Sequence, residues 1–225
     1  MTGSAAMLLW YDIVPEQVTE HDGWHTREHF PERVGIPGFL CAQRWVAHAA
    51  TSPRYFVRYD VRDVATLTSP AYESRLNHPS HWTQRMMPHF RGMVRGFCAI
   101  EHESGSSIGA EMLTIRFDAD PAHRGALMQW LGENCLPRVA QRRGFANACT
   151  LAAAVQPPMT SEQSLRGRDA TVDGVVLVSS YAAGMLDALQ GDDLASQTLE
   201  MRGAKPGIAY GRYAFACRAD AAGAL

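Results

Sequence analysis

The spacing of hydrophobic and polar residues changes several times along the chain, and the order of these changes occurs twice. Runs with a period of two are typical of half-buried strands, and runs with a period near 3.6 are typical of amphipathic helices. In the first half the pattern predicts strands at 7–14, 39–48, 54–61 and 93–102, with helical regions at 15–30 and 63–90. In the second half it predicts strands at 111–120, 145–155, 173–181 and 207–219, with helices at 121–143 and 183–201.

Each half therefore has the order strand, helix, strand, strand, helix, strand, which is the βαββαβ order of a ferredoxin-like α+β unit. We predict two repeats, 1–106 and 107–225, on either side of a Gly105-Ser106-Ser107 linker. Helices cover only one face of such a sheet, so its other face needs a partner. We expect the two sheets to pack face to face as a pseudo-dimeric barrel within one chain. The polar stretch 156–171 is expected to be a mobile loop.

The histidines are distributed unequally between the halves. Only His123 of the nine histidines lies in the second half, which predicts a site in the first repeat and a mainly structural role for the second. At about 100° per residue, His25 and His29 share the helix face of Val18 and should point toward the sheet. His21, nearer the helix start, is expected to be structural. Pro31 should end or kink the helix just after His29.

An inward histidine in a cleft is suited to general acid/base catalysis, because imidazole can take and give a proton near neutral pH. We predict that His29 is catalytic and that Glu28 or Glu32 orients it. An arginine, Arg33 or Arg44, would stabilise an anionic intermediate such as an enolate. In the alternative interpretation, His29 caps backbone groups at the kink, and Glu32 and Arg33 form an ordinary ion pair.

A metal or haem site is a second alternative for the same helix. His25 and His29 are four residues apart, a spacing that can hold a transition metal. No second ligand motif accompanies them, so we rank a haem or divalent metal below chemistry without a cofactor.

Composition and motifs exclude several classes of function. The 21 basic and 23 acidic residues give a net charge of -2, so no positive field exists to hold nucleic acid. The apolar runs are too short for a membrane helix, and no basic segment precedes the first strand, so we expect a cytoplasmic protein. The five cysteines are scattered without a C-x-x-C motif. The chain also lacks the phosphate-loop, dinucleotide, serine-hydrolase and H-E-x-x-H motifs.

The segment WHTREHFPERVGIPGF (24–39), with LTSPAYESRLNHPSHWTQRM (67–86), resembles the EthD-like members of the dimeric α+β barrel superfamily. In these proteins an aromatic residue of the first helix precedes H-x-P and a Pro-Gly turn into the second strand. Here those positions hold Trp24, His29-Phe30-Pro31 and Ile36-Pro37-Gly38-Phe39. The resemblance covers about the first hundred residues, and the second half shares only the element order. It implies a pocket between helices and sheet for a small, often aromatic molecule.

We predict a pocket in the first repeat with five aromatic or imidazole side chains and one arginine in its wall: Tyr11, Trp24, His25, Tyr72, Trp82 and Arg44. We favour a cofactor-free enzyme of the lyase, isomerase or cyclase type that acts on a small cyclic or aromatic carbonyl compound. A haem- or metal-binding protein and a non-catalytic binding protein for a hydrophobic small molecule are the alternatives. We leave open whether two such pseudo-dimers assemble as a homodimer.

Overall fold

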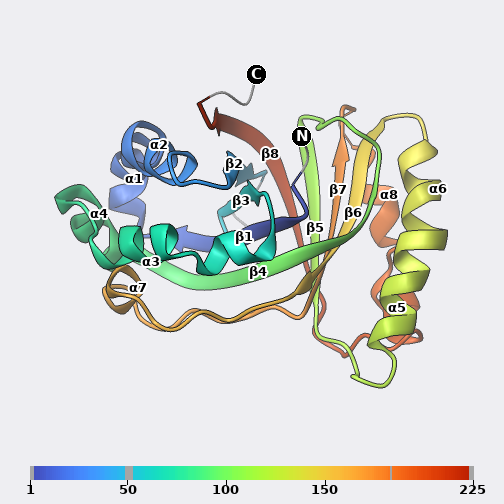
Figure 1. The fold of residues 1–225 in the computed structure, drawn as a ribbon. Coiled ribbons are helices and arrows are strands. Elements are labelled where there is room, and N and C mark those ends of the chain that lie inside the picture. Colours follow the sequence, from blue (N-terminus) through green and yellow to red (C-terminus); the bar gives the residue numbers. More distant parts are fainter. Residues whose placement is uncertain (1–2, 49–52, 183, 223–225) are drawn as a thin grey trace. The chain divides into compact units, whose positions relative to one another are not determined.

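The computed structural model describes residues 3–48, 53–182 and 184–222. Contacts divide the chain into two compact units (Figure 1). The first comprises Met1–Ala99, Ala154–Thr171 and Ala216–Leu225, and the second comprises Ile100–Ala153 and Val172–Phe215. The first unit thus includes a segment from the middle of the second predicted repeat. The repeat boundaries at 106 and 107 stay a prediction.

The first unit is built on antiparallel strands in the order β4-β1-β3-β2. Met7 and Tyr11, on one face of β1, belong to the core under the helices. The alternation in the sequence does not show which of the two faces of β1 packs against the helices. In the structure it is the face with Met7 and Tyr11. The strands are β1 (Ala5–Ile13), β2 (Phe39–Ala47), β3 (Tyr55–Val61) and β4 (Phe90–Ser104).

Two helical regions and one short helix pack on this sheet. Ser80 caps the last helix of the second region, because its hydroxyl accepts a hydrogen bond from the Thr83 backbone N–H. The helical elements are η1 (Pro15–Gln17), α1 (Val18–Trp24), η2 (His25–His29), α2 (Phe30–Val34), η3 (Val64–Thr68), α3 (Pro70–Asn77), α4 (His81–Met86), η4 (Met87–His89) and α7 (Ser161–Ser164). The last of these, α7, lies beside α3 (Figure 1), where the Ser161 backbone N–H donates to Asn77 Oδ1.

The first long helix does not end after His29, which corrects one of the two outcomes predicted for Pro31, an end or a kink. It continues to Val34 because η2 is a π turn, in which the Phe30 N–H donates to the His25 carbonyl five residues earlier. Pro31 has no N–H, and its ring would clash with the carbonyl four residues before it. The wider π turn accommodates the proline without breaking the helix.

The second unit has the antiparallel order β8-β5-β7-β6 with its own core. The single helix predicted at 183–201 is wrong, because two short helices with Gly191 between them occupy this region. The elements are β5 (Glu111–Phe117), α5 (Arg124–Trp130), η5 (Leu131–Cys135), α6 (Leu136–Gln141), β6 (Phe145–Ala153), β7 (Gly174–Ser180), α8 (Asp187–Gln190), α9 (Ser196–Glu200) and β8 (Ala209–Asp220).

The first helix and second strand of each unit correspond residue by residue. Both helices contain a π turn just before a proline, and both second strands begin after a glycine with positive φ and a bulge. The corresponding pairs, each 106 positions apart, are Trp24 and Trp130, Pro31 and Pro137, Gly38 and Gly144, and Phe39 and Phe145.

All eight strands follow one antiparallel order, β1-β3-β2-β8-β5-β7-β6-β4, which closes on itself as a barrel. The α+β class and the two sets of four strands are therefore as predicted. Packing of two separate sheets face to face stays a prediction. Among the described residues, no helix is long and apolar enough to cross a membrane.

Two glycines near the first helix have opposite requirements. Gly38 has φ +95°, and a Cβ there would lie 2.6 Å from Thr66 Oγ1. Gly23 lies in α1, and a Cβ there would meet nothing within 4 Å. We expect Gly38→Ala to lower the free energy of unfolding by about 1 to 3 kcal/mol. The matched Gly23→Ala should raise it by about 0.5 to 1 kcal/mol. Urea denaturation of both variants checks this, and equal effects would contradict it.

Candidate functional site

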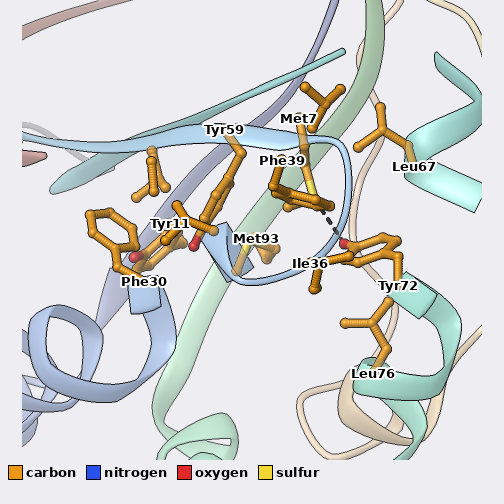
Figure 2. Close-up of a cluster of buried hydrophobic side chains, with 14 of the residues drawn as sticks. Met7, Tyr11, Phe30, Ile36, Phe39, Tyr59, Leu67, Tyr72, Leu76 and Met93 are labelled. Carbon is orange, nitrogen blue, oxygen red and sulfur yellow. Dashed lines mark hydrogen bonds between the residues drawn. The ribbon is translucent and has the colours of Figure 1, made fainter. Parts of the chain in front are cut away.

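The first unit contains a small cavity between its sheet and helices. Its volume is about 30 Å³, which is room for one or two water molecules. Part of the wall is the aromatic and methionine core drawn in Figure 2, where the Tyr72 hydroxyl points to the Met7 sulfur at 3.1 Å. The lining residues are Met7, Leu9, Tyr11, His25, His29, Arg33, Val57, Tyr59, Tyr72, Leu76, Met87, Phe90, Met93, Arg95, Glu162 and Arg166.

Three histidines form a buried column along the helix that borders this cavity. The ring centroids of His21 and His25 are 5.0 Å apart and those of His25 and His29 are 5.4 Å apart, with interplanar angles of 24° in both pairs. All three residues are buried. The helical wheel correctly placed His25 and His29 inward. His21 is fully buried as well, although it lies nearer the helix start.

The π turn brings Arg33 onto the same helix face. Residues of an α-helix turn by about 100° each. A π turn holds one extra residue, so the twelve steps from His21 to Arg33 turn like about eleven, which is close to three full turns. Arg33 therefore follows His29 on the same face of the helix and lines the cavity. In an unbroken α-helix it would be rotated away.

His21 connects the Asp22 carboxylate to the cavity wall. Its Nδ1 lies 3.1 Å from Asp22 Oδ1, and its Nε2 lies 3.1 Å from the Tyr11 hydroxyl. A carboxylate can only accept, so Nδ1 donates to Asp22 and Nε2 accepts from Tyr11. Asp22 also accepts from the Tyr55 hydroxyl and pairs with Arg44. Half-burial would raise the pKa of Asp22, but the His21 hydrogen bond and the Arg44 charge lower it.

The histidines are neutral because burial opposes their charged form. Burial lowers the pKa of His21, with a partial offset from Asp22. It lowers the pKa values of His25 and His29 well below 6.5, and Arg33 lowers both further. The Nδ1 atoms of His25 and His29 are buried without a hydrogen-bond partner among the described residues. His25 Nε2 is 3.5 Å from the Tyr59 hydroxyl.

Arg33 is paired with a carboxylate that the sequence analysis missed. Its NH2 donates to Glu162 Oε2 at 2.5 Å, and its NH1 is buried without a partner among the described residues. The pKa of Arg33 rises despite its burial, because the Glu162 charge favours the guanidinium. Glu162 belongs to α7, within the stretch that we predicted to be a mobile loop. The alternative interpretation had Arg33 paired with Glu32, whereas the structure pairs it with Glu162.

The two carboxylates predicted to orient His29 have other partners. Glu28 accepts from the Ser80 hydroxyl at 2.5 Å, and Glu32 lies 3.4 Å from Arg75 at the surface. Neither lines the cavity. Burial raises the pKa of Glu32, with an offset from Arg33 and Arg75. No described contact connects either carboxylate to the His29 ring.

The predicted pocket wall is present in part. Tyr11, His25 and Tyr72 line the cavity together with His29 and Arg33. Three other predicted residues, Trp24, Trp82 and Arg44, do not line it. Trp24 lies behind His29 at 4.3 Å between ring centroids and donates to Thr83, Trp82 donates to Glu20, and Arg44 donates to the Asp22 carbonyl.

The second unit has the same helix without these polar groups. The positions of His21, His25 and His29 are occupied there by Leu127, Leu131 and Cys135, and that of Arg33 by Val139. All four replacements are buried in the core of the second unit. The π turn and proline are kept, so the backbone geometry does not depend on the histidines.

Comparison with solved structures shows which fold this is. An anthrone oxidase-like protein matches with a TM-score of 0.70 at 12% identity, covering 98% of this chain and 94% of that one. A putative monooxygenase from Fusobacterium nucleatum matches with a TM-score of 0.59 at 8% identity, covering 98% and 96%. A chlorite dismutase from Candidatus Nitrospira defluvii, carrying two substitutions, matches with a TM-score of 0.55 at 11% identity, covering 95% and 92%.

These neighbours are dimeric α+β barrel proteins. The chain has their fold. At such low identity the likeness extends to the fold alone. No protein-family model matches the chain, and no curated protein of similar sequence was found.

The neutral histidines make folding sensitive to acid. An unfolded histidine has a pKa near 6.5, whereas the folded pKa values here are lower. Below about pH 6.5 the unfolded chain therefore binds protons that the folded chain does not. Each histidine then lowers stability by up to about 1.4 kcal/mol per pH unit as the pH falls. His25→Leu, which copies Leu131 of the second unit, should remove one such contribution.

Chemical denaturation of wild type and His25→Leu between pH 7.5 and 5 measures the two slopes. The variant should lose stability less steeply below pH 6.5, whatever its stability at pH 7.5. His81→Ala is the matched control, since His81 is exposed and its loss should leave the wild-type slope. Parallel curves for wild type and His25→Leu would contradict the assignment of a neutral buried imidazole.

Proposed function

We propose that the protein is a cofactor-free acid/base enzyme that moves a proton on a small aromatic ketone or phenol bound in the first-unit cavity. The observation that carries this proposal is the meeting of neutral His29, the Tyr11 hydroxyl and the Arg33 guanidinium in one buried wall. Removal of a proton next to a carbonyl group is the first step both of isomerisation or lyase reactions and of oxidation by O2. The anthrone oxidase-like neighbour supports an aromatic ketone as substrate.

His29 is the proton acceptor in this proposal. A base must be unprotonated when the substrate arrives, and the lowered pKa of His29 keeps it so at neutral pH. The low basicity of His29 is offset when an anion forms beside the imidazolium, because opposite charges in a buried site stabilise each other. Stacking against Trp24 at 4.3 Å holds the ring in place.

Tyr11 is the second proton-handling group. Its hydroxyl donates to His21, and His21 is held by Asp22. As the Tyr11 oxygen takes a proton from the substrate, the proton of its own hydroxyl can pass to His21, because Asp22 stabilises the imidazolium that results. Burial raises the pKa of Tyr11 well above 10, so the hydroxyl is protonated at rest. It can accept a hydrogen bond from the substrate while it donates to His21.

Arg33 stabilises the oxygen that gains negative charge. Its buried NH1 has no partner among the described residues, and a donor fixed before the reaction needs no reorganisation when charge develops. We also infer that the two repeats arose by duplication and that the second kept the helix geometry while losing the chemistry. The residues Leu127, Leu131, Cys135 and Val139 support this inference.

Haem or metal binding through His25 and His29 is the second candidate, because neutral imidazole is the form that binds metals. The described residues contain no group of three or more His, Cys, Asp or Glu side chains placed to hold a metal ion. We therefore rank a metal ion below the acid/base proposal. A Soret band that appears with haemin and shifts in His29→Ala would favour it.

The acid/base proposal is tested by exchange of the methylene protons of anthrone in D2O, followed by NMR. Wild type should speed exchange above the buffer rate. His29→Ala should lower the enzymatic rate by roughly two to four powers of ten with little change in thermal unfolding. His81→Ala, at an exposed histidine, should keep the wild-type rate.

Oxygen uptake in the same samples identifies the step after proton removal. One O2 consumed per anthrone, with anthraquinone and water as products, would identify an oxidase. Exchange without uptake would favour isomerase or lyase chemistry. If His29 instead has only a structural role, His29→Ala should cost about 1 to 3 kcal/mol of stability and leave the folded fraction fully active. That result would overturn the assignment.

A further inference from the structure

The cavity borders a buried chain of five alternating charges. Arg33 NH2 lies 2.5 Å from Glu162 Oε2, and Glu162 Oε1 lies 3.9 Å from Arg166 NH1. Asp169 Oδ2 lies 2.9 Å from Arg166 NH2 and 2.9 Å from Arg95 Nε. Every one of these side chains is at most 8% exposed. The three residues between the terminal arginines come from the segment Ala154–Thr171.

This segment is an addition to the second repeat. Residues 48–54 connect β2 to β3, whereas the corresponding connection from β6 to β7 comprises residues 154–173. Backbone bonds hold the longer connection to the first unit, since Arg95 N–H donates to the Ala170 carbonyl and Ala170 N–H donates to the Met93 carbonyl. The segment therefore supplies part of the wall of the first-unit cavity.

The charge chain leaves one positive charge unmatched. Three guanidinium groups face two carboxylates, and the histidines that line the cavity are neutral. The nearby surface pair of Glu32 with Arg75 adds no net charge. The unmatched donor is also identifiable: Arg33 lines the cavity, and its NH1 is buried and has no partner among the described residues. Burying a net charge is costly unless a partner of opposite charge is present.

We propose that the cavity is a binding site for an aromatic monoanion, whose single charged oxygen group pairs with Arg33 NH1 while its ring lies among the tyrosines and methionines. Glu162 and Asp169 restrict the site to one negative charge. The inference rests on the proposed function, in which such an anion forms during the reaction. It extends that function to ligands that are anionic from the start, whether substrates or inhibitors.

A hollow next to the cavity offers such a ligand a route of entry. A neighbouring hollow of about 280 Å³ shares Phe90, Met93 and Arg166 with the cavity. Arg168 and Asp169 also line this hollow, so together with Arg166 its charged lining has a net positive charge. Methionine side chains are unbranched and adapt their shape readily. Movement of Met93 and Arg166 would join the two spaces and make room for a fused ring system.

The test is a pair of isosteric probes, 2-naphthoate and the neutral 2-naphthamide, titrated by calorimetry at pH 7.5. Wild type should bind the anion at least about tenfold more tightly than the amide, as expected for a charge-assisted bond. Arg33→Met should reduce this preference to within about twofold. Glu162→Gln keeps the shape but removes one negative charge, and it should increase the preference by at least about threefold.

Arg27→Met is the matched control, because Arg27 is exposed on the same π turn and its charge is screened by solvent. It should keep the wild-type preference. The opposite signs expected for Arg33→Met and Glu162→Gln separate a charge effect from a loss of folding, which would weaken both probes in both variants. Equal binding of the two probes to wild type, or a Glu162→Gln variant that binds both more weakly, would overturn the proposal.

This outcome is independent of turnover. Naphthoate has no acidic methylene group, so its binding does not need the proton transfer assigned to His29. A preference for the anion without anthrone exchange would leave the binding site standing and reject the proposed function. Anthrone exchange without a preference for the anion would reject the anion-binding site and leave the proposed function standing.

Discussion

The missing N–H of Pro31 determines the geometry of the candidate site. A proline at this point of a helix would ordinarily break the hydrogen-bond ladder, and the chain keeps the helix by widening one turn, with the Phe30 N–H reaching back to the His25 carbonyl. The extra residue in that turn rotates everything after it. Arg33 consequently comes below the histidine column instead of facing away from it, and it meets Glu162 and the cavity.

The second unit shows that the π turn can form without the polar side chains of the first unit. Its helix has the same π turn before Pro137, yet the buried positions hold Leu127, Leu131 and Cys135. Stacked imidazoles are therefore not needed to hold the turn. In the first unit, imidazoles occupy the positions that apolar residues fill in the second, and burial keeps them neutral, which makes the fold sensitive to acid. Such a substitution pattern is better explained by a function of the histidines than by stability.

The sequence predicted more of the fold than of the site, for identifiable physical reasons. Strand periodicity located both sets of four strands, since alternation along a strand is a local signal. The helical wheel placed His25 and His29 inward but gave no position for Arg33, because the helix was expected to end or kink at Pro31 and a π turn cannot be read from a 100° period. The pairing of Arg33 with Glu162 spans 129 positions and follows no period. Only the tertiary fold could bring these two residues together.

The buried charges of the first unit argue against a purely structural role for the cavity. Each buried ion loses several kcal/mol of hydration, and exchange of such pairs for apolar side chains is often neutral or stabilising. The chain itself shows that an apolar side chain can occupy this position, because the residue of the second unit that corresponds to Arg33 is the buried Val139. A fold that tolerates valine at this position gains little stability from an arginine whose carboxylate partner must be supplied by a long connection of the other repeat. The arginine and its connection are therefore best explained by the anionic ligand that we propose for Arg33 NH1.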